Sequence, residues 1–134
     1  MKKDIQPPKV EDIAVAVVPE LNDLAELEWN VYVINFKSKN IEGVLVSSHG
    51  YGTIDEEQVK TTELRHFLDE MKANSFKKVE MIMENTFGLT NQYWVSFWEN
   101  NSMLDKKFLF VPDSIQDANL VMIPLIGKKG VVIR

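Results

Sequence analysis

The sequence predicts an all-β protein, an antiparallel β-sandwich that is Ig-like in its general architecture. Short runs rich in β-branched and aromatic residues recur along the 134 residues, and turn-forming residues separate them. Two adjacent asparagines, Asn100 and Asn101, divide a long stretch of alternating apolar residues as a hairpin turn would. These observations predict about eight short strands, with at most one or two short helical turns.

The length suits one domain and hardly two. The QPPK run marks a flexible N-terminal arm over residues 1–9, and we expect one sandwich domain over residues 10–134. The run IAVAVV at residues 13–18 follows acidic residues and ends at Pro19, which favours a strand over a signal peptide. No segment approaches the ~20 apolar residues of a membrane helix. The chain has no cysteine, which fits a soluble protein of the reducing cytoplasm.

Three strands are expected in the first part of the chain, at residues 13–18, 29–37 and 41–48. The run WNVYVINFK at residues 29–37 is the clearest of them, because it is dense in β-branched and aromatic residues. The acidic connection at residues 19–28 could hold one helical turn. The three strands together predict a meander, in which neighbours in sequence are neighbours in the sheet.

Residues 61–75 have two interpretations. Leu64, Phe67, Leu68 and Met71 follow helical spacing. The extended alternative places Leu64, His66 and Leu68 on one face, and Arg65, Phe67 and Met71 on the other. The surrounding elements are all strands, and this context favours the extended interpretation.

A strand at residues 77–84 is followed by a predicted hairpin at residues 92–112. A two-residue turn at Asn100 and Asn101 pairs Trp98 with Met103 and Trp94 with Lys107. The core face then carries Tyr93, Val95, Phe97, Leu104, Lys106 and Phe108. The opposite, partly wet face carries Trp94, Ser96, Trp98, Met103, Asp105 and Lys107.

The C-terminal part supplies one helical turn and the last strands. Residues 112–120 could form a helical turn with Ser114 as its cap. The apolar runs at residues 121–127 and 130–134 are strand-like. Pro124 is expected at an edge or a bulge, because proline cannot donate to a sheet ladder.

The stretch SSHGYG at residues 47–52 resembles an active-site loop in composition. His49 could be a general base, a metal ligand or part of a phosphate loop. The phosphate-loop motif is absent, however, and no clear helix follows the glycines. The alternative interpretation is a turn in which His49 and Tyr51 cover the end of the sandwich.

The sequence gives little support to metal or nucleophilic chemistry, so neither a cofactor nor a metal is expected. Zinc needs three or four nitrogen or sulfur ligands, and the chain offers His49, His66 and no cysteine. No serine lies in a Gly-x-Ser-x-Gly elbow. The formal charge of -5 argues against nucleic acid as the main partner.

Trp94, Trp98, Met103 and Lys107 form the stronger candidate site. They share one face of the predicted hairpin and could form an exposed aromatic platform, and tryptophan is enriched at binding hot spots. The structural alternative is a cation–π pair of Lys107 over Trp94, with the tryptophans packed beneath a loop or a third strand.

The runs at residues 29–52, 61–68, 105–115 and 123–131 together resemble a family of short bacterial proteins of unknown function. Some members are labelled phenylalanyl-tRNA synthetase alpha subunit. A class II synthetase has an Arg-x-Glu core in its second motif, whereas Arg65 is followed here by His66 and Phe67. The resemblance therefore implies a recurring bacterial domain, and no ATP-binding residue carries over.

The sequence thus predicts a non-enzymatic module that binds a protein partner, or a second copy of itself, through a sheet edge or the Trp94/Trp98 face. Open sheet edges can recruit partners by strand addition. A small-ligand binder or enzyme that uses the His49 loop is the alternative, and a synthetase-related protein is the third hypothesis.

Overall fold

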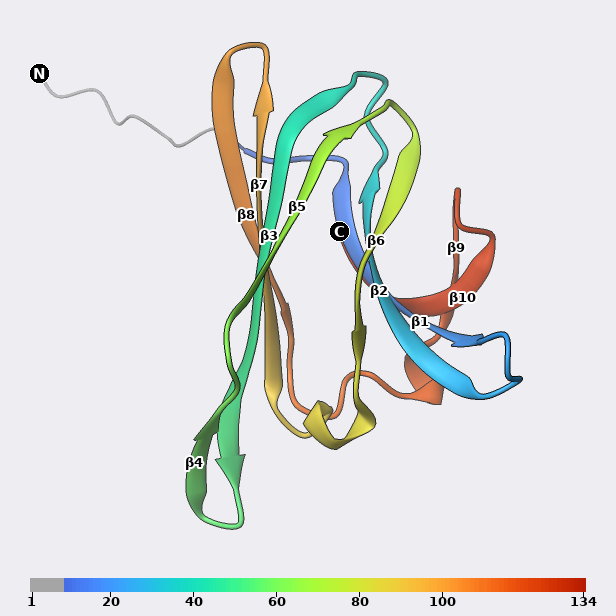
Figure 1. Ribbon diagram of the computed structural model, residues 1–134, viewed down its shortest axis with the longest axis vertical. Helices are drawn as coiled ribbons and strands as arrows, with labels where there is room; N and C mark the ends of the chain where they lie inside the picture. Colours follow the sequence, from blue (N-terminus) through green and yellow to red (C-terminus); the bar gives the residue numbers. More distant parts are fainter. Residues whose placement is uncertain (1–8) are drawn as a thin grey trace, which may run out of the picture.

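The computed structural model describes residues 9–134 and shows two antiparallel sheets packed face to face (Figure 1), which confirms the predicted all-β sandwich. The first eight residues of the predicted N-terminal arm lie outside the described residues. The strands are β1 (Ile13–Leu21), β2 (Leu27–Asn35), β3 (Ile41–Ile54), β4 (Glu57–Lys60), β5 (Leu64–Met71), β6 (Ser75–Ile82), β7 (Thr90–Glu99), β8 (Ser102–Phe110), β9 (Val121–Ile123) and β10 (Lys128–Ile133). Two 3-10 turns, η1 (Glu84–Thr86) and η2 (Asp117–Asn119), are the helical segments of this part of the chain, and neither could cross a membrane.

The first sheet, which we call sheet A, has the strand order β6-β2-β1-β10-β9. Its central strand β1 is buried on both faces from Ile13 to Val18, which explains its unbroken apolar run. On the outer face the small side chains of Ala14 and Ala16 leave room for Ile123 of β9. Gly130 of β10 lies close to the backbone of β1, and a Cβ at this position would lie 2.8 Å from the carbonyl oxygen of Val17. Glycine is therefore required there.

The second sheet, sheet B, has the order β4-β3-β7-β8, and β5 also pairs with β3. The β7–β8 hairpin has the predicted register, with Trp98 opposite Met103 and Trp94 opposite Lys107. Asn100 and Asn101 have φ values of 48° and 63°, as a primed two-residue turn needs. The turn chemistry therefore decides which side chains of this hairpin face solvent.

The main core lies between the two sheets. Sheet A contributes the inward side chains of β1 and β2, and sheet B contributes those of β3, β7 and β8. Tyr93, Phe97 and Phe108 are buried there as the hairpin register predicts. The inner face of each sheet is apolar and would contact water if the sheet stood alone, so burial of these faces against each other drives folding.

The predicted meander of three strands is wrong, because β3 belongs to sheet B. β2 ends at the buried Asn35. Its side chain fixes the loop by which the chain passes from sheet A to sheet B. The Asn35 Nδ2 donates to the carbonyl oxygens of Lys39 and Lys72 at 2.9 and 3.1 Å, and its Oδ1 accepts from the Lys37 amide. The acidic connection at residues 22–26 is a tight turn without the helical turn suggested for it.

The extended interpretation of residues 61–75 is confirmed, since Leu64–Met71 forms β5. The predicted grouping of Met71 with Arg65 and Phe67 on one face is wrong, because Met71 is fully buried while the other two are exposed. Asp69 has a φ of 60° at a bulge between β3 and β5, so the alternation shifts by one residue before Met71. Arg65 and Phe67 precede the bulge and share one exposed face, as the alternation predicts.

The C-terminal expectations hold in part. A helical turn forms at η2, but Gln116 precedes it and no side chain caps it, so Ser114 is not the cap. The strands β9 and β10 form, and Pro124 lies in the turn between them rather than in a strand.

Glu20 links the β1–β2 hairpin to β10 and gives a pH-dependent prediction. Its carboxylate accepts hydrogen bonds from Asn30, Tyr32 and Lys128. Burial alone would raise the pKa of Glu20, but these hydrogen bonds outweigh burial and hold the pKa below its ordinary value. The resulting stability is present above about pH 4.3, the ordinary pKa, and is lost as pH falls through the lower folded pKa.

We therefore expect Glu20→Gln to destabilise the protein by about 1 kcal/mol at neutral pH and by less in acid. Urea unfolding of both proteins between neutral pH and about pH 3 measures this difference. A difference that stays constant with pH would contradict a depressed pKa at Glu20. Met122→Gln, at an exposed methionine of β9, serves as the control substitution.

Candidate functional site

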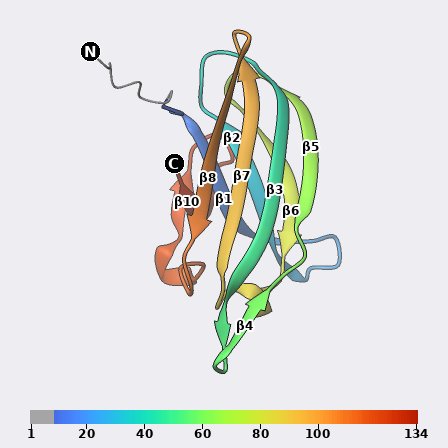
Figure 2. The same ribbon diagram turned by 90° about the vertical axis from the view of Figure 1, so that its left-hand side faces the viewer.

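The outer face of sheet B is uncovered by the rest of the described chain, as Figure 2 shows with β8, β7, β3 and β5 in front. Its centre is the pair Trp94 and Trp98, with exposed fractions of 42% and 46%. Trp94 lies between Ser47 of β3 and Lys107 of β8, and Trp98 lies opposite Met103. The structure thus brings the four predicted platform residues together on one face.

Trp94 is held in place by two neighbours on β8. Its Nε1 donates a hydrogen bond to Asp105 Oδ2 at 2.9 Å. The ammonium of Lys107 lies 4.9 Å from the centre of the indole ring, which is the cation–π contact that the structural alternative named, although no loop or third strand within residues 9–134 covers the ring. Both contacts fix the indole while leaving much of its surface open, so little entropy would be lost on binding.

Trp98 rests on a glycine of the neighbouring strand. Gly43 has a φ of 57°, which favours glycine, and a Cβ at that position would lie 3.0 Å from Trp98 Cδ1. The ladder between β3 and β7 shifts register here, between Glu42 and Leu45. Glycine and bulge together let the indole lie against the β3 backbone, which supports Trp98 without burying it.

Phe67 of β5 extends the apolar surface and was not singled out from the sequence. It is 66% exposed, and its register partner Leu45 also pairs with Ser96, which lies between the tryptophans on β7. A partial signal was available, because the extended interpretation places Phe67 on the same face as the charged Arg65. We call Phe67, Trp94, Trp98 and Met103 the aromatic face.

The stretch 47–52 is part of the long strand β3, and the interpretation as a turn at the sandwich end is wrong. Gly50 is needed there for close packing, since a Cβ would lie 3.1 Å from Asn91 Oδ1 and 3.3 Å from Thr61 Cγ2. The chain turns later, at Asp55 and Glu56, which both have positive φ.

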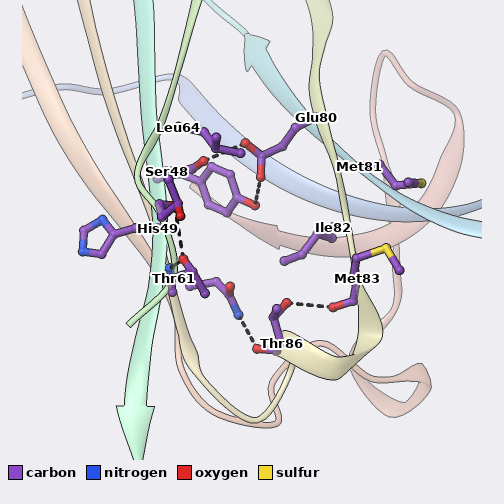
Figure 3. Close-up of a pocket in the computed structure, with 13 residues that line it drawn as sticks. Ser48, His49, Thr61, Leu64, Glu80, Met81, Ile82, Met83 and Thr86 are labelled. Atoms are coloured by element: carbon purple, nitrogen blue, oxygen red, sulfur yellow. Dashed lines mark hydrogen bonds between the residues drawn. The ribbon is translucent and has the colours of Figure 1, made fainter. Parts of the chain in front are cut away.

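His49 and Tyr51 lie on the outer face of sheet B, because they alternate with the buried Ser48 and Gly50. Their ring centres are 5.4 Å apart, so the two rings lie side by side. Figure 3 shows the imidazole of His49 directed away from the cavity beside it. No hydrogen bond or ion pair joins His49 to another side chain within residues 9–134.

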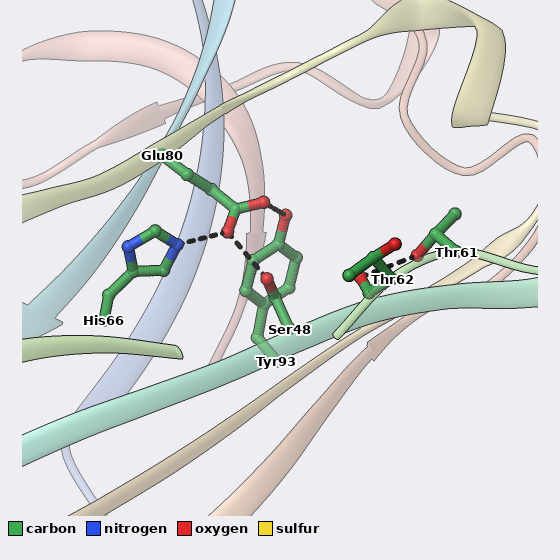
Figure 4. A network of polar contacts seen from close by, with 6 residues as sticks. All are labelled: Ser48, Thr61, Thr62, His66, Glu80 and Tyr93. Atoms are coloured by element: carbon green, nitrogen blue, oxygen red, sulfur yellow. Dashed lines mark hydrogen bonds and ion pairs between the residues drawn. The ribbon is translucent and has the colours of Figure 1, made fainter. Parts of the chain in front are cut away.

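A polar cluster that the sequence did not predict lies where the two sheets meet. Glu80 of β6 accepts hydrogen bonds from Ser48 at 2.6 Å and from Tyr93 at 3.3 Å (Figure 4). His66 Nε2 lies 2.8 Å from the same Glu80 oxygen that Ser48 contacts. Burial, and then the carboxylate of Glu80, raise the pKa of Tyr93 well above its ordinary value, so its hydroxyl stays protonated as a donor.

Glu80 reaches this position through a bulge in β6. Val31 pairs with Glu80 and Tyr32 with Lys78, which leaves Val79 without a partner. Val79 and Glu80 therefore both face the interior, where strict alternation would send one of them outward. The carboxylate of Glu80 lies between Ser48 and His66. In hydrolytic triads the histidine lies between the serine and the acid, so this arrangement is different.

Among residues 9–134, no group of three or more His, Cys, Asp or Glu side chains is arranged to hold a metal ion. His66 is engaged with Glu80, while His49 faces outward on another strand.

Comparisons of the chain with family models, with curated proteins and with solved structures found no match. The resemblance to short bacterial proteins therefore stays a prediction.

Proposed function

We propose that the protein is a non-enzymatic, cytoplasmic interaction module of Ig-like type, which binds a protein partner through the aromatic face of sheet B. The observation that carries this proposal is the pair of half-exposed tryptophans on an uncovered sheet. Buried tryptophan would stabilise the fold more, so two of them held open in fixed orientations favour a role in recognition.

The composition of the aromatic face supports a protein partner. Its aromatic side chains and Met103 are apolar, the small polar Ser96 lies between the tryptophans, and Arg65, Asp105 and Lys107 supply charges beside them. Aromatic residues, methionine and arginine are enriched at protein interfaces. The sheet is broad and open, which suits a folded partner with an apolar patch of its own.

The aromatic face is favoured over the His49 loop as the functional site. The imidazole of His49 points away from the neighbouring cavity and contacts only Tyr51 among the aromatic rings. A general base needs a substrate group within hydrogen-bond reach, and this orientation offers no enclosed place for one.

A photocrosslinking experiment tests the proposal. A photoreactive phenylalanine analogue replaces Ser96, which lies between the tryptophans on β7, and the control carries it at the exposed Met122 of β9. We expect adducts with a defined partner, or with a second copy, from position 96 only, and their loss when Trp98→Ala is added. Equal adducts from both positions, or none from position 96, would argue against the aromatic face.

A further inference from the structure

Strand β6 has an open hydrogen-bonding edge over its second half. It pairs with β2 on one side, and no strand within residues 9–134 pairs with its other side. At the start of β6, Lys77 covers that side, because its Nζ donates to the carbonyl oxygens of Leu68 and Glu70. Beyond Lys77 the backbone from Glu80 to Ile82 can pair with an added strand.

A cavity of about 260 Å³ lies on the inner side of this edge. Figure 3 shows Glu80 and Ile82 of β6 directed toward it and Met81 directed to the other side. Among residues 9–134, no lysine or arginine lines this cavity. Glu80 receives contacts from Ser48, Tyr93 and His66, while a carboxylate offers about four acceptor sites, so one further donor can bind.

A groove of about 580 Å³ lies on the outer side of the same edge. Its apolar lining includes Met81 and Met83, which are 51% and 58% exposed, and the exposed Leu27. Methionine adapts its shape to different apolar ligands. Of the described residues, the charged side chains that line the groove are Glu26, Glu28 and Glu84, all acidic, and Lys78 lies 3.7 Å from the carboxylate of Glu28.

We infer that the Glu80–Ile82 edge of β6 binds an extended segment of a partner protein, in which basic and apolar residues alternate. An added strand directs alternate side chains to opposite faces. The basic side chains would enter the inner cavity toward Glu80, and the apolar ones would cover Met81 and Leu27 in the outer groove. The formal charge of -5 favours such a basic partner. Strand β6 contributes no residue to the aromatic face, and the cavity lies on the opposite side of sheet B from that face, so the inference does not depend on the proposed function.

The test uses a fluorescent peptide of about seven residues in which valine and lysine alternate, long enough to form one strand. Fluorescence anisotropy measures its binding to the full chain. We expect saturable binding, and at least tenfold weaker binding to Met81→Lys, because an added lysine repels the peptide and discourages strand pairing. Met122→Lys, at the exposed methionine of β9, should bind like the unmodified protein.

Two further controls separate the inference from nonspecific attraction. A peptide in which valine and glutamate alternate should not bind, and a valine–lysine peptide without alternation should bind at least tenfold more weakly. Amide hydrogen exchange should slow, when the alternating peptide is bound, at those residues of the Glu80–Ile82 segment whose N–H groups point away from β2. The inference is overturned if the alternating peptide does not bind, if Met81→Lys binds it equally, or if exchange slows elsewhere only.

Discussion

Replacing Phe97 with alanine is expected to destabilise the protein by about 3–5 kcal/mol, the cost of removing a large side chain from a packed core. Phe97 is fully buried between the sheets, and its hairpin partner is Leu104. The neighbouring Trp98→Ala should cost about half as much, roughly 1.5–2.5 kcal/mol, because nearly half of that side chain already contacts water. Urea unfolding of both variants measures the contrast.

The contrast matters because the two residues are adjacent on β7 and point to opposite faces. If Trp98→Ala destabilised the protein as much as Phe97→Ala, the indole would be part of the fold, and the aromatic face would lose its centre. If Phe97→Ala cost less than about 1 kcal/mol, the register of the hairpin would be wrong. Similar slopes of unfolding with urea would show that both variants unfold from a comparable native state.

The elements that the sequence predicted well are those with strong local signals. Asn100 and Asn101 accept positive φ, so they place the turn, and the turn sets the register of every pair in the β7–β8 hairpin. The alternation of Phe97 and Trp98 then separates core from surface. For the same reason, the residues of the aromatic face on this hairpin could be found before the fold was known.

The elements that were missed depend on contacts between distant parts of the chain. Asp69 adopts positive φ at a bulge, and no local signal marks it, so the burial of Met71 was not predicted. The bulge at Val79 likewise directs Glu80 toward the interior. The cluster of Glu80 with Ser48 and Tyr93 was therefore not predicted. Side-chain alternation fails after each bulge, and only the three-dimensional pairing reveals the shift.

The glycines of residues 50 and 52 were misread for a related reason. Glycine is typical of turns, but here Gly50 permits close packing of Thr61 and Asn91 within a strand. Likewise, the passage of the chain from β2 in sheet A to β3 in sheet B depends on the buried Asn35. The carbonyl groups that accept its hydrogen bonds, at Lys39 and Lys72, lie on two separate loops. Single-sequence patterns do not contain these pairings.

The central claim is that the aromatic face binds a protein partner. The affinity of the protein for that partner, once the crosslinked partner is purified, tests this claim most directly. Trp94→Ala combined with Trp98→Ala should weaken binding by about a hundredfold, which corresponds to about 2.8 kcal/mol. Truncation of tryptophan anchors at the centre of an interface commonly costs this much. Met122→Ala, an exposed methionine outside sheet B, should bind with unchanged affinity. A folded double variant that binds within about threefold of the unmodified protein, a loss of only about 0.7 kcal/mol, would contradict the account.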